Sequence, residues 1–222
     1  MGLIKERLSL IRKRVADAAR RIGRDPNKIT IVAVSKVKPV ADIVTAYEAG
    51  HRHFGESYIQ EFQSKREELP PLPGAIFHMI GRLQSNKTKQ ASKFFDVIQT
   101  VDSEKLVRRL SDTGRNVDIF LEVKLSGDED RAGLVEADIE RVKRLVENCP
   151  HINLRGLMGM PPWCDDPKHT RPYFQRLRYL AGQYELSELS MGMSRDFEIA
   201  IEEGSTLVRV GTAIFGQRAH SR

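Results

Sequence analysis

Residues 29–36, which read ITIVAVSK, are the stretch that decides the fold. A run of β-branched, mostly apolar residues is typical of a strand in a parallel sheet that is buried on both faces. The run ends in Lys36, and in such folds the functional site lies at the carboxyl ends of the strands. An amine leaving an apolar wall there is partly desolvated, which makes it a nucleophile for carbonyl groups. Alternatively, Lys36 caps the strand and points to solvent.

The composition is that of an ordinary globular protein. The chain has 222 residues, 40% of them hydrophobic and 30% charged, which is enough for a sizeable core. Its 36 Lys and Arg against 30 Asp and Glu give a net charge of +6, a surplus that could attract phosphorylated small molecules or nucleic acid. Cys149 and Cys164 lack metal-type spacing, and no apolar run could span a bilayer. We therefore expect a cytoplasmic protein with free thiols, no metal site and no membrane association.

Hydrophobic periodicity divides the chain into alternating elements. Apolar residues recur at helical spacing over residues 4–22, and Gly23 ends that pattern. Apolar runs bounded by turn residues predict eight strands, at residues 29–36, 53–56, 76–80, 96–101, 117–125, 153–158, 186–191 and 206–210. Further helices are predicted at residues 40–49, 58–69, 103–110, 136–148, 171–185 and 197–203. This order predicts an α/β fold, a (β/α)8 TIM barrel with an additional N-terminal helix, in a single domain over residues 1–222.

Small residues follow the last two predicted strands. Ser194 lies after the seventh, and Gly211 and Thr212 lie after the eighth. These loops commonly hold a phosphate in such barrels, because they expose backbone N–H groups, although the same residues also occur in ordinary turns. Arg209 stands one residue before the end of the eighth strand. In that apolar setting it needs a buried acceptor, which could also be a structural carboxylate.

A lysine on the first strand and a phosphate site after the seventh and eighth suit pyridoxal 5'-phosphate (PLP), which is held through an amine and its phosphate. Longer motifs then match a known family, in order, over nearly the whole chain. They are residues 33–39 (AVSKVKP), 54–61 (FGESYIQE), 78–87 (HMIGRLQSNK), 156–158 (GLM) and 190–216. By these motifs the chain resembles the pyridoxal phosphate homeostasis protein family, whose fold is an alanine-racemase-like barrel.

The resemblance implies a role for each matching position. Lys36 carries PLP as an aldimine, Ser194, Gly211 and Thr212 hold the phosphate, and Arg209 faces the pyridine nitrogen. It implies no catalytic residue.

Four positions depart from the family pattern. Ser57 stands where asparagine is usual, Phe77 where tryptophan is usual, Lys124 where asparagine is usual, and Arg131 where lysine is usual. Ser57 and Lys124 concern contacts around the cofactor ring. We also expect His78 to line the ring pocket; a strand histidine satisfied by a backbone carbonyl is the alternative.

The resemblance predicts a protein that holds PLP and delivers it to the apo-forms of PLP enzymes, without turnover of its own. The rival interpretation is a PLP-dependent amino-acid racemase or lyase on the same barrel, which would need a second acid/base group and a closed site; in 222 residues we expect no room for the second domain that closes such a site. A nucleic-acid-binding protein is disfavoured, because the basic N-terminal helix lacks interleaved aromatic residues. We expect a monomer.

Overall fold

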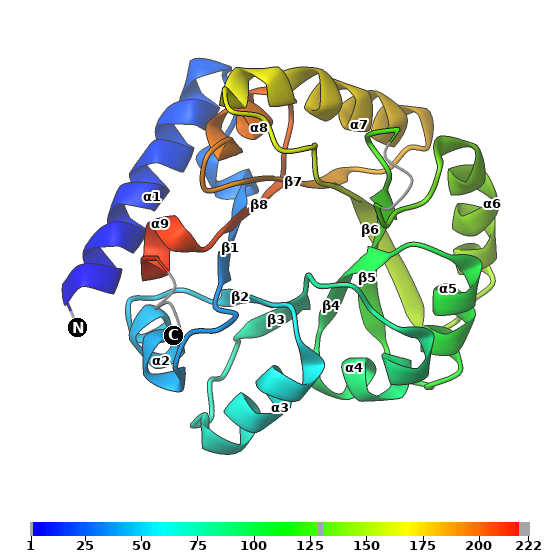
Figure 1. Ribbon diagram of the computed structural model, residues 1–222, viewed down its shortest axis with the longest axis horizontal. Helices are drawn as coiled ribbons and strands as arrows, with labels where there is room; N and C mark the ends of the chain where they lie inside the picture. The colour runs from blue at the N-terminus through cyan, green and yellow to red at the C-terminus, as the bar shows by residue number, and fades with distance from the viewer. Residues whose placement is uncertain (1, 128–130, 218–222) are drawn as a thin grey trace.

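The structure is a computed structural model that describes residues 2–127 and 131–217. Eight parallel strands close into a barrel in chain order, with β1 hydrogen-bonded to β8 (Figure 1). The strands are β1 (Thr30–Val34), β2 (His53–Glu56), β3 (Ile76–Met79), β4 (Val97–Val101), β5 (Val117–Val123), β6 (Ile152–Gly159), β7 (Glu188–Met193) and β8 (Leu207–Val210). The predicted (β/α)8 barrel is therefore confirmed.

Helices surround the barrel in the ring that Figure 1 shows. They are α1 (Gly2–Arg21), α2 (Val40–Glu48), α3 (Ile59–Glu68), α4 (Thr88–Phe94), α5 (Glu104–Ser111), α6 (Glu136–Glu147), α7 (Arg171–Gln183), α8 (Phe197–Glu202) and α9 (Thr212–Phe215). Within the described ranges, none of them is long and apolar enough to cross a membrane.

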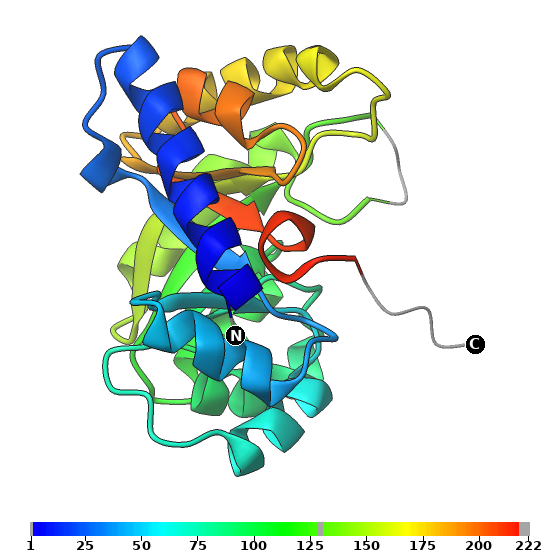
Figure 2. The same ribbon diagram turned by 90° about the vertical axis from the view of Figure 1, so that its left-hand side faces the viewer.

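The additional N-terminal helix α1 lies along the outside of the barrel, packed against α8 and α9 (Figures 1 and 2). Its predicted apolar face is buried at Leu8, Ile11 and Val15, so burial of that face holds the helix to the barrel. The helix ends just before Gly23, whose φ of +70° is the left-handed conformation that glycine adopts without a steric penalty.

The strand pleat separates two buried clusters. On β5, Ile119 and Leu121 belong to the large cluster between strands and helices. Phe120, which points to the opposite face, belongs to a small cluster with Val32 and Met158 inside the barrel. Apolar side chains thus fill part of the interior, as in other barrels of this size.

Some local features differ from the sequence prediction. Helices α4 and α9 were not anticipated, because helices of seven and four residues are too short to show a clear apolar period. The strand predicted over residues 186–191 is β7 and begins at Glu188 instead. The reason is the end of α7, where Glu185 has a φ of +55° and the N–H of Leu186 returns to the carbonyl of Ala181.

Candidate functional site

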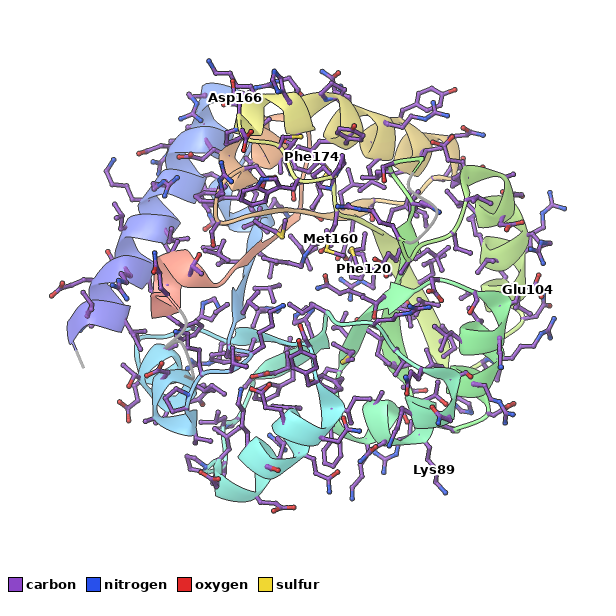
Figure 3. All side chains as sticks on the ribbon, viewed as in Figure 1. Lys89, Glu104, Phe120, Met160, Asp166 and Phe174 are labelled. Carbon is purple, nitrogen blue, oxygen red and sulfur yellow. The ribbon has the colours of Figure 1, made fainter. Side chains whose placement is uncertain are left out.

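A cavity of about 620 Å³ opens at the carboxyl ends of the strands. Val34 on β1, Ile80 just after β3 and Arg209 on β8 line it. The ends of β5 and β7 and the loops after β1, β5, β6, β7 and β8 also contribute to its wall. Figure 3 shows Met160, from the loop after β6, over the centre of the barrel, whereas Glu104 lies on the outer ring. The cavity therefore occupies the position where barrels of this type keep their chemistry.

Lys36 follows β1 and lines this cavity, with its side chain half-buried. The structure thus places Lys36 at the cavity wall. Lys124 and Arg131, two of the positions that depart from the family pattern, line the same cavity. Positively charged side chains therefore gather around one opening.

Ser194, Gly211 and Thr212 meet at the cavity from two different loops. The N–H of Gly211 donates to Ser194 Oγ at 3.3 Å, which ties the loop after β7 to the loop after β8. A side chain at position 211 would bring a Cβ to 3.3 Å from both the Cβ and the carbonyl oxygen of Val34. Glycine therefore lets the start of α9, with its N–H groups that no helical carbonyl can pair, lie close against β1.

Arg209 is 4% exposed and meets neutral acceptors. Its Nη1 donates to the carbonyl of Ser190 at 2.8 Å and to Ser190 Oγ at 2.6 Å, and its Nη2 donates to the carbonyl of Gly159 at 3.1 Å. Burial lowers the pKa of Arg209 to about 10, with Glu122 and Asp196 opposing that shift from a distance. The predicted buried acceptor thus exists, and within the described residues it is not a directly bonded carboxylate. A guanidinium has five N–H donors, so donors remain for a ligand.

A chain of hydrogen bonds runs from Arg209 through the barrel interior. Ser190 Oγ donates to Gln99 Oε1 at 2.6 Å, Gln99 Nε2 contacts His78 Nδ1 at 2.9 Å, and His78 Nε2 contacts His53 Nδ1 at 3.1 Å. An amide nitrogen only donates, so His78 Nδ1 must accept and its proton must sit on Nε2. In every hydrogen bond of this chain, the donor therefore lies on the Arg209 side and the acceptor on the His53 side.

His78 and Ser57 are not among the residues that line the cavity. His78 is 2% exposed and is satisfied by the Gln99 and His53 side chains, where the sequence suggested a backbone carbonyl as the alternative. Burial lowers the pKa of His78 to about 3, so this ring is neutral at physiological pH. Ser57 is also buried, and its backbone packs against Gly81, where an added Cβ would lie 2.1 Å from the Ser57 carbonyl oxygen.

Two carboxylates that the sequence did not single out line the cavity, Glu122 and Asp196. Burial raises the pKa of Glu122 to about 7, reinforced by Asp102 and opposed by Arg209. Burial also raises the pKa of Asp196, whose Oδ1 accepts the N–H of Met193 at 2.6 Å. A glutamate that interrupts an apolar strand was the available sequence signal for the first; no comparable pattern marks the second.

Fold and site together define the class: an alanine-racemase-like barrel with a lysine at the end of its first strand. Residues 7–219 match the family model described as the N-terminal domain of alanine racemase. An alanine racemase from Clostridium difficile 630 superposes with a TM-score of 0.68 at 11% identity, over 95% of this chain and 57% of that one. At that identity the likeness shows the fold alone.

Other relatives give the particular family. The pyridoxal phosphate homeostasis protein of Vibrio alginolyticus is 37% identical over 233 residues, covering 100% of both chains. That of Pseudomonas aeruginosa is 39% identical over 224 residues, covering 98% of this chain and 97% of the relative. The chain belongs to the pyridoxal phosphate homeostasis protein family.

Two solved structures of PipY from Synechococcus elongatus have a sequence identity to this chain similar to that of these relatives. Each is 38% identical and covers 96% of this chain and 100% of PipY; the TM-score is 0.85 without PLP and 0.84 with PLP bound. PipY therefore has this fold in both states.

Proposed function

We propose that this protein binds PLP at the cavity, carries it on Lys36 and delivers it to the apo-forms of PLP enzymes. The observation that carries the proposal is the convergence of Lys36, Ser194 and Arg209, from three separate strand ends, on one cavity. The PLP-bound structure of PipY supports the choice of ligand.

The cavity suits such a ligand in size and in chemistry. Its volume of about 620 Å³ lies inside the range of small-molecule sites. Ile80, Met160 and Pro161 offer apolar surface to a planar ring, and a few polar groups stand at its edges. Gly211 has no Cβ, which leaves the start of α9 close to the wall that β1 forms. These residues fit a ligand with one aldehyde, one aromatic ring and one phosphate.

Each residue has a separate task in this proposal. PLP supplies an aldehyde that condenses with an amine, and a conjugated ring that absorbs visible light. Lys36 provides the amine, and the amide-rich start of α9 with Ser194 and Thr212 binds the phosphate. Arg209, held by Ser190 and Gly159, presents its remaining N–H donors to the ring nitrogen.

We propose that the protein turns over no substrate. Its Arg209, with a pKa of about 10, stays cationic at neutral pH and disfavours a proton on the ring nitrogen. That proton strengthens the ring as an electron sink, although an arginine there does not by itself prevent racemisation. Trp163, which also lines the cavity, is 73% exposed; we therefore expect water to enter the site, which disfavours carbanion chemistry.

A visible absorption spectrum of the purified protein mixed with PLP, before and after borohydride, tests the binding. We expect a visible band that borohydride bleaches, and a labelled peptide that contains Lys36. Lys36→Ala should abolish both while leaving the far-ultraviolet circular dichroism unchanged. Lys38→Arg is the matched control, because Lys38 bonds to the carbonyls of Phe215 and Gln217 and not to the cavity. Retained labelling in Lys36→Ala would assign the cofactor to another lysine.

Incubation of the loaded protein with L-alanine in deuterated water tests the absence of turnover. Exchange of the α-proton should not exceed that caused by free PLP. Rapid exchange that disappears in Lys36→Ala would replace the carrier proposal with the racemase or lyase alternative.

Delivery is tested by mixing the loaded protein with the apo-form of a PLP enzyme in the presence of an excess of a trap for free PLP. We expect the enzyme to regain activity despite the trap. Recovery only in the absence of the trap would mean that PLP dissociates into solution first.

A further inference from the structure

We propose that Glu61 and Lys65, on the outer helix α3, are positioning residues that fix the direction in which Lys36 leaves the barrel. The inference rests on the proposed function of Lys36 and adds two residues that do not line the cavity. They act on the backbone at both sides of Lys36.

The backbone next to Lys36 is held in an unfavourable conformation. Val37 has a φ of +53°, in the left-handed region. A β-branched residue there is a genuine outlier, and such strain persists only where the surroundings impose it. The Val37 side chain is 52% exposed, so packing of that side chain does not account for the conformation.

The peptide group after Lys36 is held by Glu61. Its Oε1 accepts the N–H of Val37 at 2.6 Å, a hydrogen bond to a charged acceptor. The same oxygen accepts from Lys65 Nζ at 2.6 Å, one helical turn further along α3. Glu61 is therefore itself held in place by a partner on a rigid element.

The peptide group before Lys36 is held by Lys65. Its Nζ donates to the carbonyl of Ser35 at 2.9 Å and to Glu56 Oε1 at 2.9 Å, and Ser35 Oγ donates to the same Glu56 oxygen at 2.8 Å. With the bond to Glu61, all three ammonium donors are engaged. Because peptide groups are planar, fixing the groups on both sides of Lys36 fixes its Cα, and with it the direction of the Cα–Cβ bond from which the side chain starts.

Glu56, Glu61 and Lys65 form a polar cluster whose burial supports a positioning role. Glu56 is fully buried, and its second oxygen, Oε2, has no hydrogen-bond partner among the described residues. Lys65 is buried as well and Glu61 is half-buried, so the carboxylate of Glu56 and the ammonium of Lys65 stand behind the strand at a desolvation cost. A purely stabilising role would be served as well by apolar side chains. These would remove the hydrogen bond from the Val37 N–H to Glu61 and the bond from Lys65 to the Ser35 carbonyl, which would keep only the turn bond from the Lys38 N–H at 3.0 Å among the bonds described here.

Substitutions at Glu61 test the proposal in two measurements. The first is the rate at which the visible band appears when apoprotein is mixed with PLP. The second is the hydrogen-exchange rate of the Val37 amide in apoprotein, followed by NMR, which does not depend on the cofactor. Glu61→Ala should slow attachment and speed exchange, each roughly ten- to a hundredfold, the effect of losing one hydrogen bond to a charged group.

Three further variants complete the set. Glu61→Gln keeps a carbonyl that can accept from Val37 and should restore most of both rates. Glu61→Met preserves the side-chain length and replaces the alanine variant if that one does not fold. Glu67→Ala, at an exposed position of the same helix, should behave like the wild type.

The outcomes separate the two proposals. If the wild type never attaches PLP, the proposed function fails, while the Val37 amide still reports whether Glu61 holds the turn. If the wild type attaches PLP and Glu61→Ala or Glu61→Met attaches it equally fast, the positioning role is wrong. Unchanged exchange at Val37 in these variants would also overturn it.

Discussion

The two ends of the barrel each contain an arginine, and the pKa values of these two arginines are shifted in opposite directions. Near the amino-terminal ends of β5 and β7, Arg155 is exposed and pairs directly with Asp118, at 2.7 Å, and with Glu188; the hydrogen bond to Glu188 is the main cause that raises its pKa. At the carboxyl end, Arg209 is buried, its bonded acceptors are neutral, and burial lowers its pKa. Arg155 is thus paired with carboxylates within the protein, whereas Arg209 bonds to neutral acceptors and keeps N–H donors for a ligand.

The comparison predicts that removing the buried arginine has the largest effect. Arg209→Leu leaves the carbonyls of Ser190 and Gly159 without their donor, and each buried unsatisfied group costs about 1–3 kcal/mol. We expect the free energy of unfolding to fall by about 2–5 kcal/mol in urea titrations. A loss below about 1 kcal/mol would mean that water replaces the guanidinium.

Ser194→Ala combined with Thr212→Ala should have the next largest effect. In the double variant, each lost hydrogen bond should cost roughly ten- to a hundredfold in affinity for PLP and little in affinity for pyridoxal, since a charge-assisted hydrogen bond contributes about 1.5–3 kcal/mol. Equilibrium titrations with both vitamers measure the difference. Equal losses for the two ligands would place the phosphate elsewhere.

The hydrogen-bond chain between the two ends predicts a pH dependence. The pKa of His78 is lowered to about 3, while the unfolded chain has a value near 6.5. Between these values the unfolded state binds more protons, so this contribution to stability is complete above pH 6.5 and is lost as the pH falls toward 3. His51, with a pKa lowered to about 4 by burial, adds a contribution of the same sign.

His78→Gln tests this contribution. An uncharged amide can occupy the chain, so the fall in unfolding free energy between pH 6.5 and 4 should become shallower, by up to about 1.4 kcal/mol per pH unit. Urea unfolding at a series of pH values provides the measurement. Parallel curves for variant and wild type would show that His78 takes up its proton without unfolding.

The smallest effect is expected at the amino end. Arg155→Ala removes exposed ion pairs, which contribute about 1 kcal/mol or less, and it should leave PLP binding unchanged. Thermal unfolding and a PLP titration of the same preparation check both statements. A loss of stability as large as that of Arg209→Leu would remove the contrast between the two ends.

The sequence was sufficient for the features that depend on local pattern. The barrel was predicted from the apolar run that ends in Lys36 and from the alternation of strands and helices after it. Both signals can be recognised in short windows of sequence, because strand burial and helix amphipathicity determine which neighbouring residues are apolar. The cavity-lining positions of Lys36, Ser194 and Gly211 followed from their places at strand ends. Periodicity could not reveal α4, which is shorter than the window that the pattern requires.

Contacts between distant strands were outside the reach of sequence patterns. That Gln99 would pair with both Ser190 and His78 depends on strand register and on how side chains stack inside the barrel. The same holds for Glu61. In the sequence it is indistinguishable from an ordinary surface residue of a helix, and its role depends on the packing of α3 beside the turn at Val37. Side-chain partners of this kind are fixed by packing.

The one-way hydrogen-bond chain has a consequence for proton conduction. A proton moves along such a chain only if each member can take it on one atom and release it from another. The amide of Gln99 accepts a hydrogen bond through oxygen and donates one through nitrogen, but near neutral pH its oxygen does not take up a proton and its nitrogen does not release one. Gln99 thus acts as an insulator, and a proton that binds His53 on the half-buried side cannot be conducted to the neighbourhood of Arg209.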